Sequence, residues 1–334
     1  MNIRESKQSM IESQAPSRGI KKHREYPWGT RRPYNAYKDY LRERFGGRLQ
    51  KVSVDAGFTC PNRDGVKANG GCTYCNNLSF VPPYCKPGMT IAEQAGAGVE
   101  YLARRYKARQ FIAYLQAYSN TYAPLPYLKS IYSQALSHPD IQGLAIGTRP
   151  DCVDPEKLDY LESLAREYYI SIEYGLESIN DRTLEAINRA HTFSEWAEAV
   201  NMTAGRNIHI CSHLIFGLPG DSREQMLETA AVVSRYPVNS LKLHHLHIVD
   251  KTQLAVQYRR DPFPVFKYNE YIDLVIEFLQ RLRPDIMIQR LVGETHPRHL
   301  IAPIWGVRAN QVQQHIEAEM RKRDVWQGKL YQGT

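Results

Sequence analysis

The sequence predicts an α/β fold, a partial or near-complete (β/α) barrel of the TIM type with a short C-terminal extension. Strand-like and helix-like segments alternate about six or seven times along the chain, and right-handed β-α-β connections place such strands in one parallel sheet covered by helices. The length of 334 residues suits a barrel of roughly 200 residues or more with flanking segments. Polar runs follow the apolar strands, at the carboxyl ends where barrel enzymes carry their active sites.

Alternation and apolar runs predict the strands. The first, KVSVD, alternates between apolar and polar residues, whereas the third, GLAIGT, is small and apolar along most of its length, as expected of a buried strand. The expected strands cover residues 51–55, 111–118, 143–148, 169–177, 209–218, 240–249 and 286–291.

Start and stop signals predict the helices. Gly46 and Gly47 end the first helix, Thr90 can cap the second with Glu93 three residues later, and Pro155 stands in the first turn of the fourth. The expected helices cover residues 35–45, 90–107, 127–137, 155–166, 181–188, 194–205, 222–235, 267–282 and 309–321.

Charge divides the chain into an arm and a body. Residues 1–50 hold 12 Lys or Arg and 5 Asp or Glu, and so carry nearly all of the net charge of +8. We expect residues 1–32 to form a basic, disordered arm, residues 33–255 the barrel core, and residues 256–334 a helical and strand extension that packs on the core. A basic arm with aromatic residues can bind a polyanion such as RNA; a solvated tail without a partner is the alternative.

Composition narrows the class of protein. Hydrophobic residues make up 43% and charged residues 23% of the chain, as in ordinary globular proteins. No segment approaches the roughly 18 apolar residues of a membrane helix, and the first residues have no apolar stretch typical of a signal peptide. We therefore expect a cytoplasmic protein without a membrane partner.

Three of the six cysteines are clustered in one loop, as Cys60, Cys72 and Cys75. In a reducing compartment such a cluster is typical of a metal or catalytic site. Structural zinc and iron–sulfur clusters both normally take four protein ligands, and Cys85 could be the fourth. Three thiolates on an iron–sulfur cluster would leave one iron open to a substrate or cofactor. Residue spacing alone leaves zinc and iron–sulfur open.

Polar residues at the strand ends are the other candidate site residues. Gln116 follows the second strand, and Arg149 follows the third, where its planar fork can clamp a carboxylate or pair with Asp151. Glu173 and Glu177 lie an even number of positions apart on the fourth strand, so they point to one face and need donors, from a ligand or from a nearby arginine.

Histidines follow on the next two strands. His213 lies on the fifth, and the sixth, KLHHLH, puts Lys242 and His244 on one face and His245 and His247 on the other. These imidazoles could bind a metal or serve as hydrogen-bonded fillers.

Taken together, these segments resemble the radical S-adenosylmethionine (SAM) superfamily, and within it the YhcC-like family, a neighbour of the elongator catalytic-subunit branch. The matching stretches are AGFTCPNRDG with GGCTYC, QAY, GTRPDC, GLES, INRAHT, SHLIFGLPG and LKLHHLHIV. The gap of eleven residues between the first two cysteines is longer than the usual three, as it is in this branch.

The resemblance implies a radical enzyme. Cys60, Cys72 and Cys75 would hold three irons of a 4Fe–4S cluster, and the fourth iron would take the amino and carboxylate groups of SAM. One electron, from a flavodoxin- or ferredoxin-like reductant, would cleave SAM to a 5′-deoxyadenosyl radical that abstracts hydrogen from a substrate, with RNA as one candidate. The alternative is a zinc-binding, nucleic-acid-binding module without radical chemistry.

The resemblance also implies cofactor-binding roles for Gln116, Arg149, Glu177, Arg189 and His213. Arg189 matches an arginine that pairs with the SAM carboxylate in the porphyrin-oxidising branch, whereas Glu177 and His213 stand where that branch has Gln and Asp as ribose contacts. Cys152 follows the third strand and is a candidate catalytic thiol, either as a hydrogen donor or as a thiyl radical; an ordinary buried cysteine is the alternative.

Overall fold

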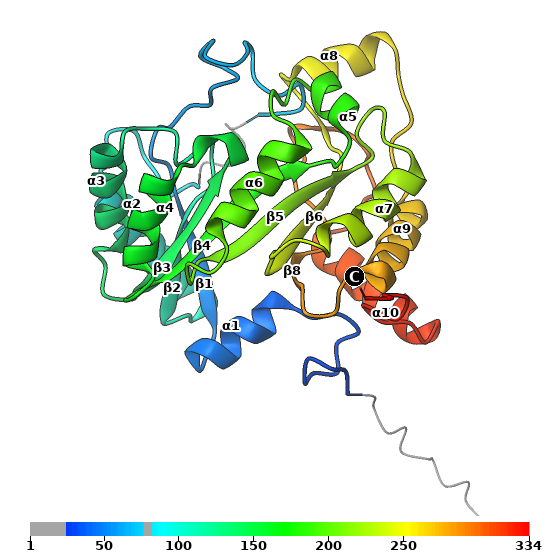
Figure 1. The fold of residues 1–334 in the computed structure, drawn as a ribbon, viewed down its shortest axis with the longest axis horizontal. Coiled ribbons are helices and arrows are strands. Elements are labelled where there is room, and N and C mark those ends of the chain that lie inside the picture. The colour runs from blue at the N-terminus through cyan, green and yellow to red at the C-terminus, as the bar shows by residue number, and fades with distance from the viewer. Residues whose placement is uncertain (1–24, 77–81, 334) are drawn as a thin grey trace, which may run out of the picture.

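A computed structural model describes residues 25–76 and 82–333, and it confirms the parallel partial barrel (Figure 1). Seven strands form one sheet in the order β1-β2-β3-β4-β5-β6-β8, and each neighbouring pair is parallel. The strands of this sheet are β1 (Leu49–Val54), β2 (Gln110–Leu115), β3 (Ile141–Thr148), β4 (Tyr169–Glu177), β5 (His209–Phe216), β6 (Ser240–His245) and β8 (Met287–Arg290).

The barrel is open between β1 and β8, its two edge strands. No ladder joins these edges among the described residues, but Lys51 Nζ on β1 donates to Gln289 Oε1 on β8 at 3.0 Å. The helix before β1 fills the amino end of the half-barrel: Tyr37 and Leu41 pack on Ile112 and Tyr169. The carboxyl end is left for a site.

Helices that follow the strands cover the outer face of the sheet (Figure 1). The helices of the described chain are α1 (Tyr37–Phe45), α2 (Ile91–Tyr106), α3 (Leu125–Leu136), α4 (Pro155–Leu164), α5 (Asp181–Ala186), α6 (Phe193–Thr203), α7 (Arg223–Val233), α8 (Gln253–Arg260), α9 (Tyr268–Arg281) and α10 (Ala309–Lys322). The predicted capping box of Thr90 and Glu93 starts α2, and Gly46 ends α1 with a φ of 66°. Local signals thus place these helix ends.

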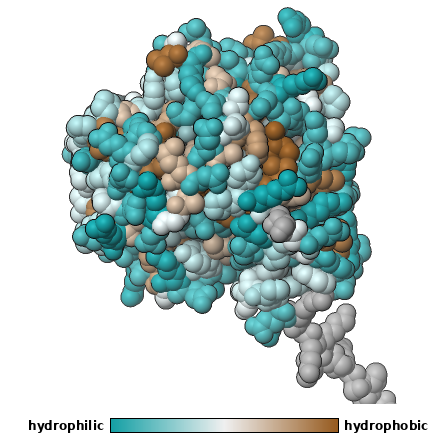
Figure 2. Space-filling view, in the orientation of Figure 1, coloured by the Kyte–Doolittle hydropathy of each residue, from teal (hydrophilic) through white to brown (hydrophobic). Residues whose placement is uncertain are grey.

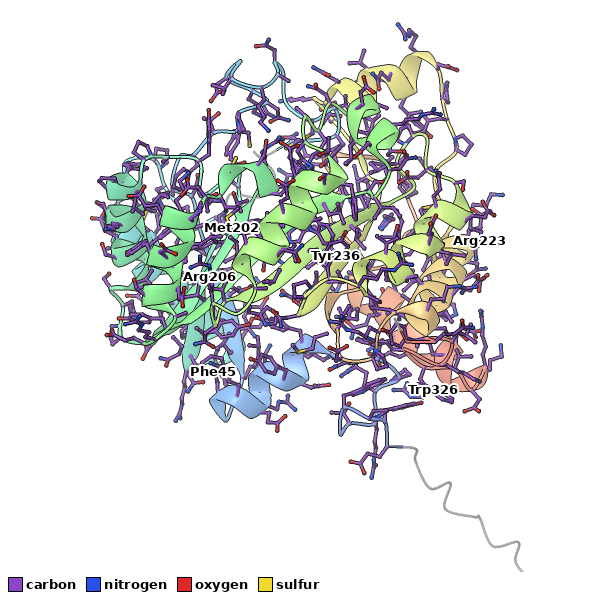
Figure 3. The ribbon with its side chains drawn as sticks, in the orientation of Figure 1. Phe45, Met202, Arg206, Arg223, Tyr236 and Trp326 are labelled. Carbon is purple, nitrogen blue, oxygen red and sulfur yellow. The ribbon has the colours of Figure 1, made fainter. Side chains whose placement is uncertain are left out.

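The main core lies between the sheet and these helices. Ile146, Ile172 and Leu243 of the sheet and Trp196 of α6 are fully buried in it. Two of the residues labelled in Figure 3 join neighbouring helices. Arg206, after α6, donates to Asp159 and Glu162 of α4. Tyr236, after α7, packs against Trp196 of α6 with ring centroids 4.9 Å apart.

Three elements differ from the prediction. The prediction of a single strand at 240–249 is wrong: the chain leaves the sheet after His245, and β7 (Ile248–Val249) pairs antiparallel with β9 (Leu300–Ala302), a strand that was not predicted. Helix α8 was not predicted either, although Thr252 caps it by accepting from the Ala255 amide at 3.1 Å. These differences begin at the end of β6, where the regular strand–helix alternation ends.

Most of the predicted arm, residues 1–24, lies outside the described residues. Of the remainder, Arg32 contacts the folded body through ion pairs with Asp39 and Glu317 of α10. Among the residues that the structure covers, no helix combines the length and apolar character needed to cross a bilayer. Figure 2 shows apolar residues on one face as separate patches among hydrophilic ones.

Candidate active site

A cavity of about 140 Å³ opens at the carboxyl ends of the strands, and it brings the predicted site residues together. Its walls come from the loop after β1, from the ends of β2 to β5, and from the segment after α5. Each predicted cysteine ligand and each predicted cofactor-binding residue lines it, namely Cys60, Cys72, Cys75, Gln116, Arg149, Glu177, Arg189 and His213.

Hydrogen bonds hold the cysteine loop against its neighbours. Asn62 Nδ2 donates to Cys72 Sγ at 3.3 Å and to the Asn188 carbonyl at 3.1 Å, and the Ser119 hydroxyl donates to Cys60 Sγ at 3.2 Å. Burial raises the pKa of the Cys75 thiol to about 12. A metal would have to offset this preference for the neutral thiol, and donors aimed at sulfur favour the thiolate that binds it.

The three loop thiols are not gathered as closely as a single zinc ion requires. Zn–S bonds of about 2.3 Å in a tetrahedron hold sulfur atoms about 3.8 Å apart. Within the described chain, the one trio of metal-binding side chains whose ligand atoms all lie within 4.8 Å is Glu173, Cys211 and His213, so the three loop thiols are spread more widely. In this arrangement they do not form a single-zinc site.

No fourth cysteine joins the three in the cavity. Cys85, the candidate fourth ligand, does not line the cavity, and its thiol lies 3.8 Å from the Ser53 carbonyl. All six cysteines are free of disulfides. The donor set is therefore three thiols, which fits a cluster with one iron left for another ligand.

Arg189 lines the cavity and has one donor without a partner among the described residues. Its Nη2 donates to the Gly175 carbonyl at 2.7 Å and lies 3.6 Å from Glu177 Oε1, and its Nη1 lies 3.6 Å from Cys72 Sγ. Its buried Nε has no hydrogen-bond partner among the described residues. An unsatisfied cationic donor beside three thiols suits an anionic group of a ligand.

Arg149, by contrast, is fully engaged within the chain. Its Nε and Nη2 each donate to Asp151 at 2.8 Å, and its Nη1 donates to the Arg189 carbonyl at 2.5 Å. Arg149 therefore clamps a carboxylate of the chain itself, the alternative that the sequence left open. Its contact with the Arg189 carbonyl makes it a positioning residue for Arg189.

Glu173 lies at the centre of a buried ionic network in the floor of the cavity. Its Oε1 binds Lys51 Nζ at 2.6 Å, and its Oε2 accepts from Tyr114 OH at 2.8 Å and from Lys242 Nζ. Burial alone would raise the pKa of Glu173, but the two ammonium groups hold it well below its usual range. Burial lowers the pKa of Lys242 to about 7, although the Glu173 carboxylate beside it favours the charged ammonium.

This network argues against a metal ion on the Glu173, Cys211 and His213 trio. Lys51 and Lys242 already neutralise the carboxylate, and a cation placed there would face both ammonium groups. His213 Nε2 lies 3.1 Å from Glu173 Oε2 and donates to it, because an ionised carboxylate can only accept; burial lowers the pKa of the imidazole to about 4, so the ring is neutral.

Strained backbone surrounds the cavity. Tyr118 and Glu177, which both line it, have φ angles of 65° and 69°, a left-handed conformation uncommon outside glycine. Such residues cost about 1–3 kcal/mol and are held by the surrounding structure, typically at functional sites. For Glu177 the kink coincides with a register shift between β4 and β5, and it turns the carboxylate toward Arg189.

The remaining predicted residues fall into two groups. Gln116 lines the cavity directly after β2. Cys152 does not line it: its buried thiol lies 3.8 Å from Asp151 Oδ1, and burial raises its pKa to about 12. Its catalytic role stays a prediction.

The sequence did not identify several residues of this site. Asn62, Tyr74 and Ser119 line the cavity, and Lys51 and Lys242 lie beneath it. A lysine between two leucines of a buried strand is a signal that could have found Lys242, because such a charge requires a buried partner.

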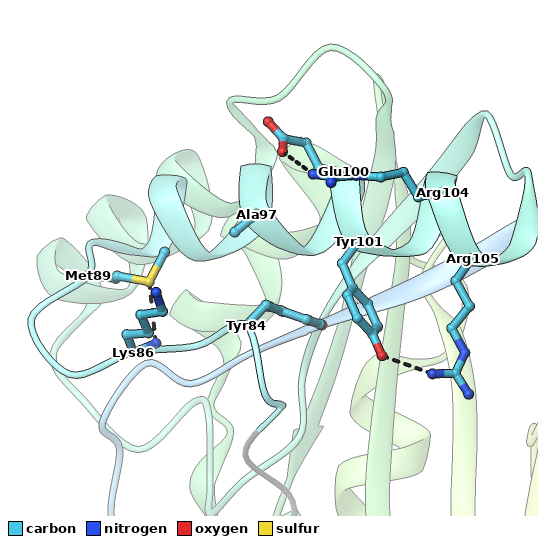
Figure 4. Close-up of a pocket in the computed structure, with 8 residues that line it drawn as sticks. All are labelled: Tyr84, Lys86, Met89, Ala97, Glu100, Tyr101, Arg104 and Arg105. Carbon is cyan, nitrogen blue, oxygen red and sulfur yellow. Dashed lines mark hydrogen bonds and ion pairs between the residues drawn. The ribbon is translucent and has the colours of Figure 1, made fainter.

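Another hollow lies on the outer face of α2, lined by residues of α2 and of the segment before it (Figure 4). Tyr84 and Tyr101 line it. Its two arginines already have partners, since Arg104 donates to the Glu100 carboxylate and Arg105 donates to the Tyr101 hydroxyl. None of the cysteines or histidines lines this surface, so it does not belong to the candidate active site.

The fold and the cavity define a barrel protein with a thiol-lined site where barrel enzymes carry their active sites. The chain belongs to the radical SAM superfamily: residues 64–233 match that superfamily, and residues 238–322 match the Radical SAM C-terminal domain. Membership implies a 4Fe–4S cluster and SAM as cofactors. The predicted boundary at residue 255 stays a prediction.

The chain is similar to two bacterial proteins and shares its fold with a solved structure. Protein YtqA of Bacillus subtilis is 35% identical over 303 residues, 91% of this chain and 94% of YtqA. Protein YhcC of Escherichia coli is 35% identical over 272 residues, 81% of this chain and 87% of YhcC. The Elp3 structure of Methanocaldococcus infernus has a TM-score of 0.66 at 15% identity, over 84% of this chain and 64% of that one, and so shares the fold.

Proposed function

We propose that this chain is a radical SAM enzyme in which Cys60, Cys72 and Cys75 hold a 4Fe–4S cluster. The observation that carries the proposal is the meeting of three thiols and the unpartnered Arg189 Nε in one cavity, without a fourth cysteine. Such a cluster, bound with SAM and reduced by one electron, supplies a 5′-deoxyadenosyl radical that abstracts hydrogen from a substrate.

The residues around the thiols would bind and orient SAM. Arg189 would hold its carboxylate through Nε, and Arg149 would fix the Arg189 backbone through the contact at 2.5 Å. Gln116, Glu177 and His213 would face the polar groups of the nucleoside. The small cavity would exclude water and other C–H groups from the radical.

Anaerobic reconstitution with iron and sulfide tests this proposal. We expect a brown protein that forms 5′-deoxyadenosine when given dithionite and SAM, and we expect Ala at Cys60, Cys72 and Cys75 together to abolish both properties. Cys85→Ala is the matched control and should retain both, because Cys85 lies outside the cavity. Formation of 5′-deoxyadenosine by the triple variant, or a colourless protein with one bound zinc, would overturn the proposal.

We further propose that the substrate is an RNA, that the electron comes from a flavodoxin- or ferredoxin-like protein, and that the enzyme acts in the cytoplasm. The basic first 50 residues support the RNA proposal. A comparison of modified nucleosides between wild-type and deletion cells tests it: one nucleoside should be lost or replaced, and an unchanged set would refute it.

A further inference from the structure

A second and larger cavity lies beside the site, with a volume of about 770 Å³. Its walls are formed by the segment after β8, by the ends of β6 and β9, and by the start of α10. Trp305 supplies an aromatic wall, stacked on His245 with ring centroids 4.0 Å apart and held by its Nε1 donating to the Phe266 carbonyl at 2.9 Å. Its volume is several times that of the thiol-lined cavity and lies in the range of ligand-binding pockets.

A short row of side chains connects the two cavities. His213 lines the thiol cavity, and the His244 ring lies 6.2 Å from it, centroid to centroid. Next to His244 comes Gly293, where an added Cβ would lie 2.6 Å from His244 Nδ1. Gly293 and His247 line the larger cavity. His244 therefore lies between the two cavities, next to the Gly293 wall of the larger one.

Arg290, at the end of β8, adds a positive charge to this row that no carboxylate of the described chain balances. Its Nη2 donates to His244 Nδ1 at 3.3 Å, and its buried Nε has no hydrogen-bond partner among the described residues. No carboxylate of the described chain lies within ion-pair distance of it. The nearest interior carboxylate in the network, Glu173, is already bound by Lys51 and Lys242. The interior therefore has a surplus of positive charge.

His244 adds a directed donor to this charge. Burial, with Arg290 beside it, holds the pKa of His244 well below its usual range, so the ring is neutral. Since Nδ1 accepts from Arg290, the proton lies on Nε2. Arg290, with its unpartnered Nε–H, and His244, with its Nε2–H, are in contact through Nη2 and Nδ1, and both are donors suited to an oxyanion.

We propose that Arg290 and His244 bind an anionic group of the substrate, a carboxylate or a phosphate, and that the rest of the substrate lies in the larger cavity against Trp305. This inference rests on the proposed function, because it assigns the substrate side of the same site. It predicts an organic anion with an apolar or aromatic part, since Val292, Leu300 and Ile304 also line the cavity.

Binding of small probes to the full-length protein tests the inference without reductant or SAM. The probes are phenylacetate and phenyl phosphate, with neutral phenylacetamide as the reference, and the readout is tryptophan fluorescence. We expect the anions to change the fluorescence, Trp305→Phe to remove that change, and Arg290→Gln to weaken anion binding about tenfold to a hundredfold while leaving phenylacetamide unaffected. Tighter binding of phenyl phosphate would fit an RNA substrate, whereas tighter binding of phenylacetate would identify a carboxylate and contradict the RNA proposal.

Arg298→Gln is the matched control, because it removes the same charge from an exposed position of the same segment outside the cavity. It should bind the probes as the wild type does. If Arg290→Gln does not fold, Gly293→Ala takes its place, since its methyl group would push His244 away from Arg290. Equal binding of anions and amide by the wild type, or anion binding unchanged in Arg290→Gln and Gly293→Ala, overturns the inference.

The two proposals can fail separately. A protein that forms no 5′-deoxyadenosine but binds anions through Arg290 refutes the proposed function and leaves the anion site. A protein that forms 5′-deoxyadenosine but does not distinguish the anions from the amide refutes the anion site alone.

Discussion

Substitution of Glu173 by Gln should destabilise the fold more than any exposed ion pair can. The Glu173 side chain has no solvent exposure, and its partners Lys51 and Lys242 are 22% and 9% exposed. Gln keeps the shape and removes the charge, which leaves two largely buried ammonium groups without a counter-ion. Breaking a buried pair in this way costs about 3–5 kcal/mol.

Urea unfolding of the wild type and of Glu173→Gln measures this cost. Glu100→Gln is the control: Glu100 binds Arg104 in an exposed pair with side chains 71% and 80% exposed, so its loss should cost at most about 0.5 kcal/mol. Adding Lys242→Met to Glu173→Gln should restore part of the loss, because it removes one unpaired charge. A cost below about 1 kcal/mol for Glu173→Gln, or a further loss in the double variant, would refute the electrostatic account of this network.

Three further predictions concern single positions. Burial lowers the pKa of His209 to about 3, so the stability it contributes is complete above its unfolded pKa of about 6.5 and is lost as the pH falls toward 3. Between pH 7.5 and pH 5, protonation of this group should lower the free energy of unfolding of the wild type by about 2 kcal/mol. The free energy of His209→Gln should fall by about 2 kcal/mol less over the same range, and an equal fall for both proteins in urea unfolding would contradict the assignment. Gly175→Ala should reduce 5′-deoxyadenosine formation at least about tenfold, because its Cβ would lie 2.5 Å from Glu177 Oε1 and also contact Arg189 Nη2. Gly96→Ala, in α2 with open space around its Cα, should instead raise stability by about 0.5–1 kcal/mol without affecting turnover. Arg189→Lys should weaken SAM binding about tenfold by calorimetry, since lysine has no fork to replace the guanidinium, and unchanged affinity would exclude Arg189 as the carboxylate partner.

The sequence predicted the fold because its signals are local. Residues adjacent in the sequence determine the buried strand at 141–148 and the capping box at Thr90, and right-handed connections then order the strands in the sheet. The site residues could be predicted for a related reason: they follow successive strands, and the carboxyl ends of parallel strands converge. The ion pair of Lys51 and Glu173 joins positions 122 residues apart, and no local pattern indicates it.

Three arginines of the site show where prediction from the sequence ends. Arg149 and Arg189 both follow strand or helix ends, and the sequence offers both as carboxylate partners. Asp151 occupies the Nε of Arg149, whereas Arg189 reaches Glu177 only through Nη2, at 3.6 Å, and keeps a buried Nε without a partner among the described residues. Arg290 has the same unpartnered Nε, although nothing in its local sequence distinguishes it. Which arginine can take a ligand depends on whether the chain's own acceptors engage its Nε first. That competition is settled by three-dimensional packing, so the arginines that keep an unpartnered Nε are the ones we assign to ligands.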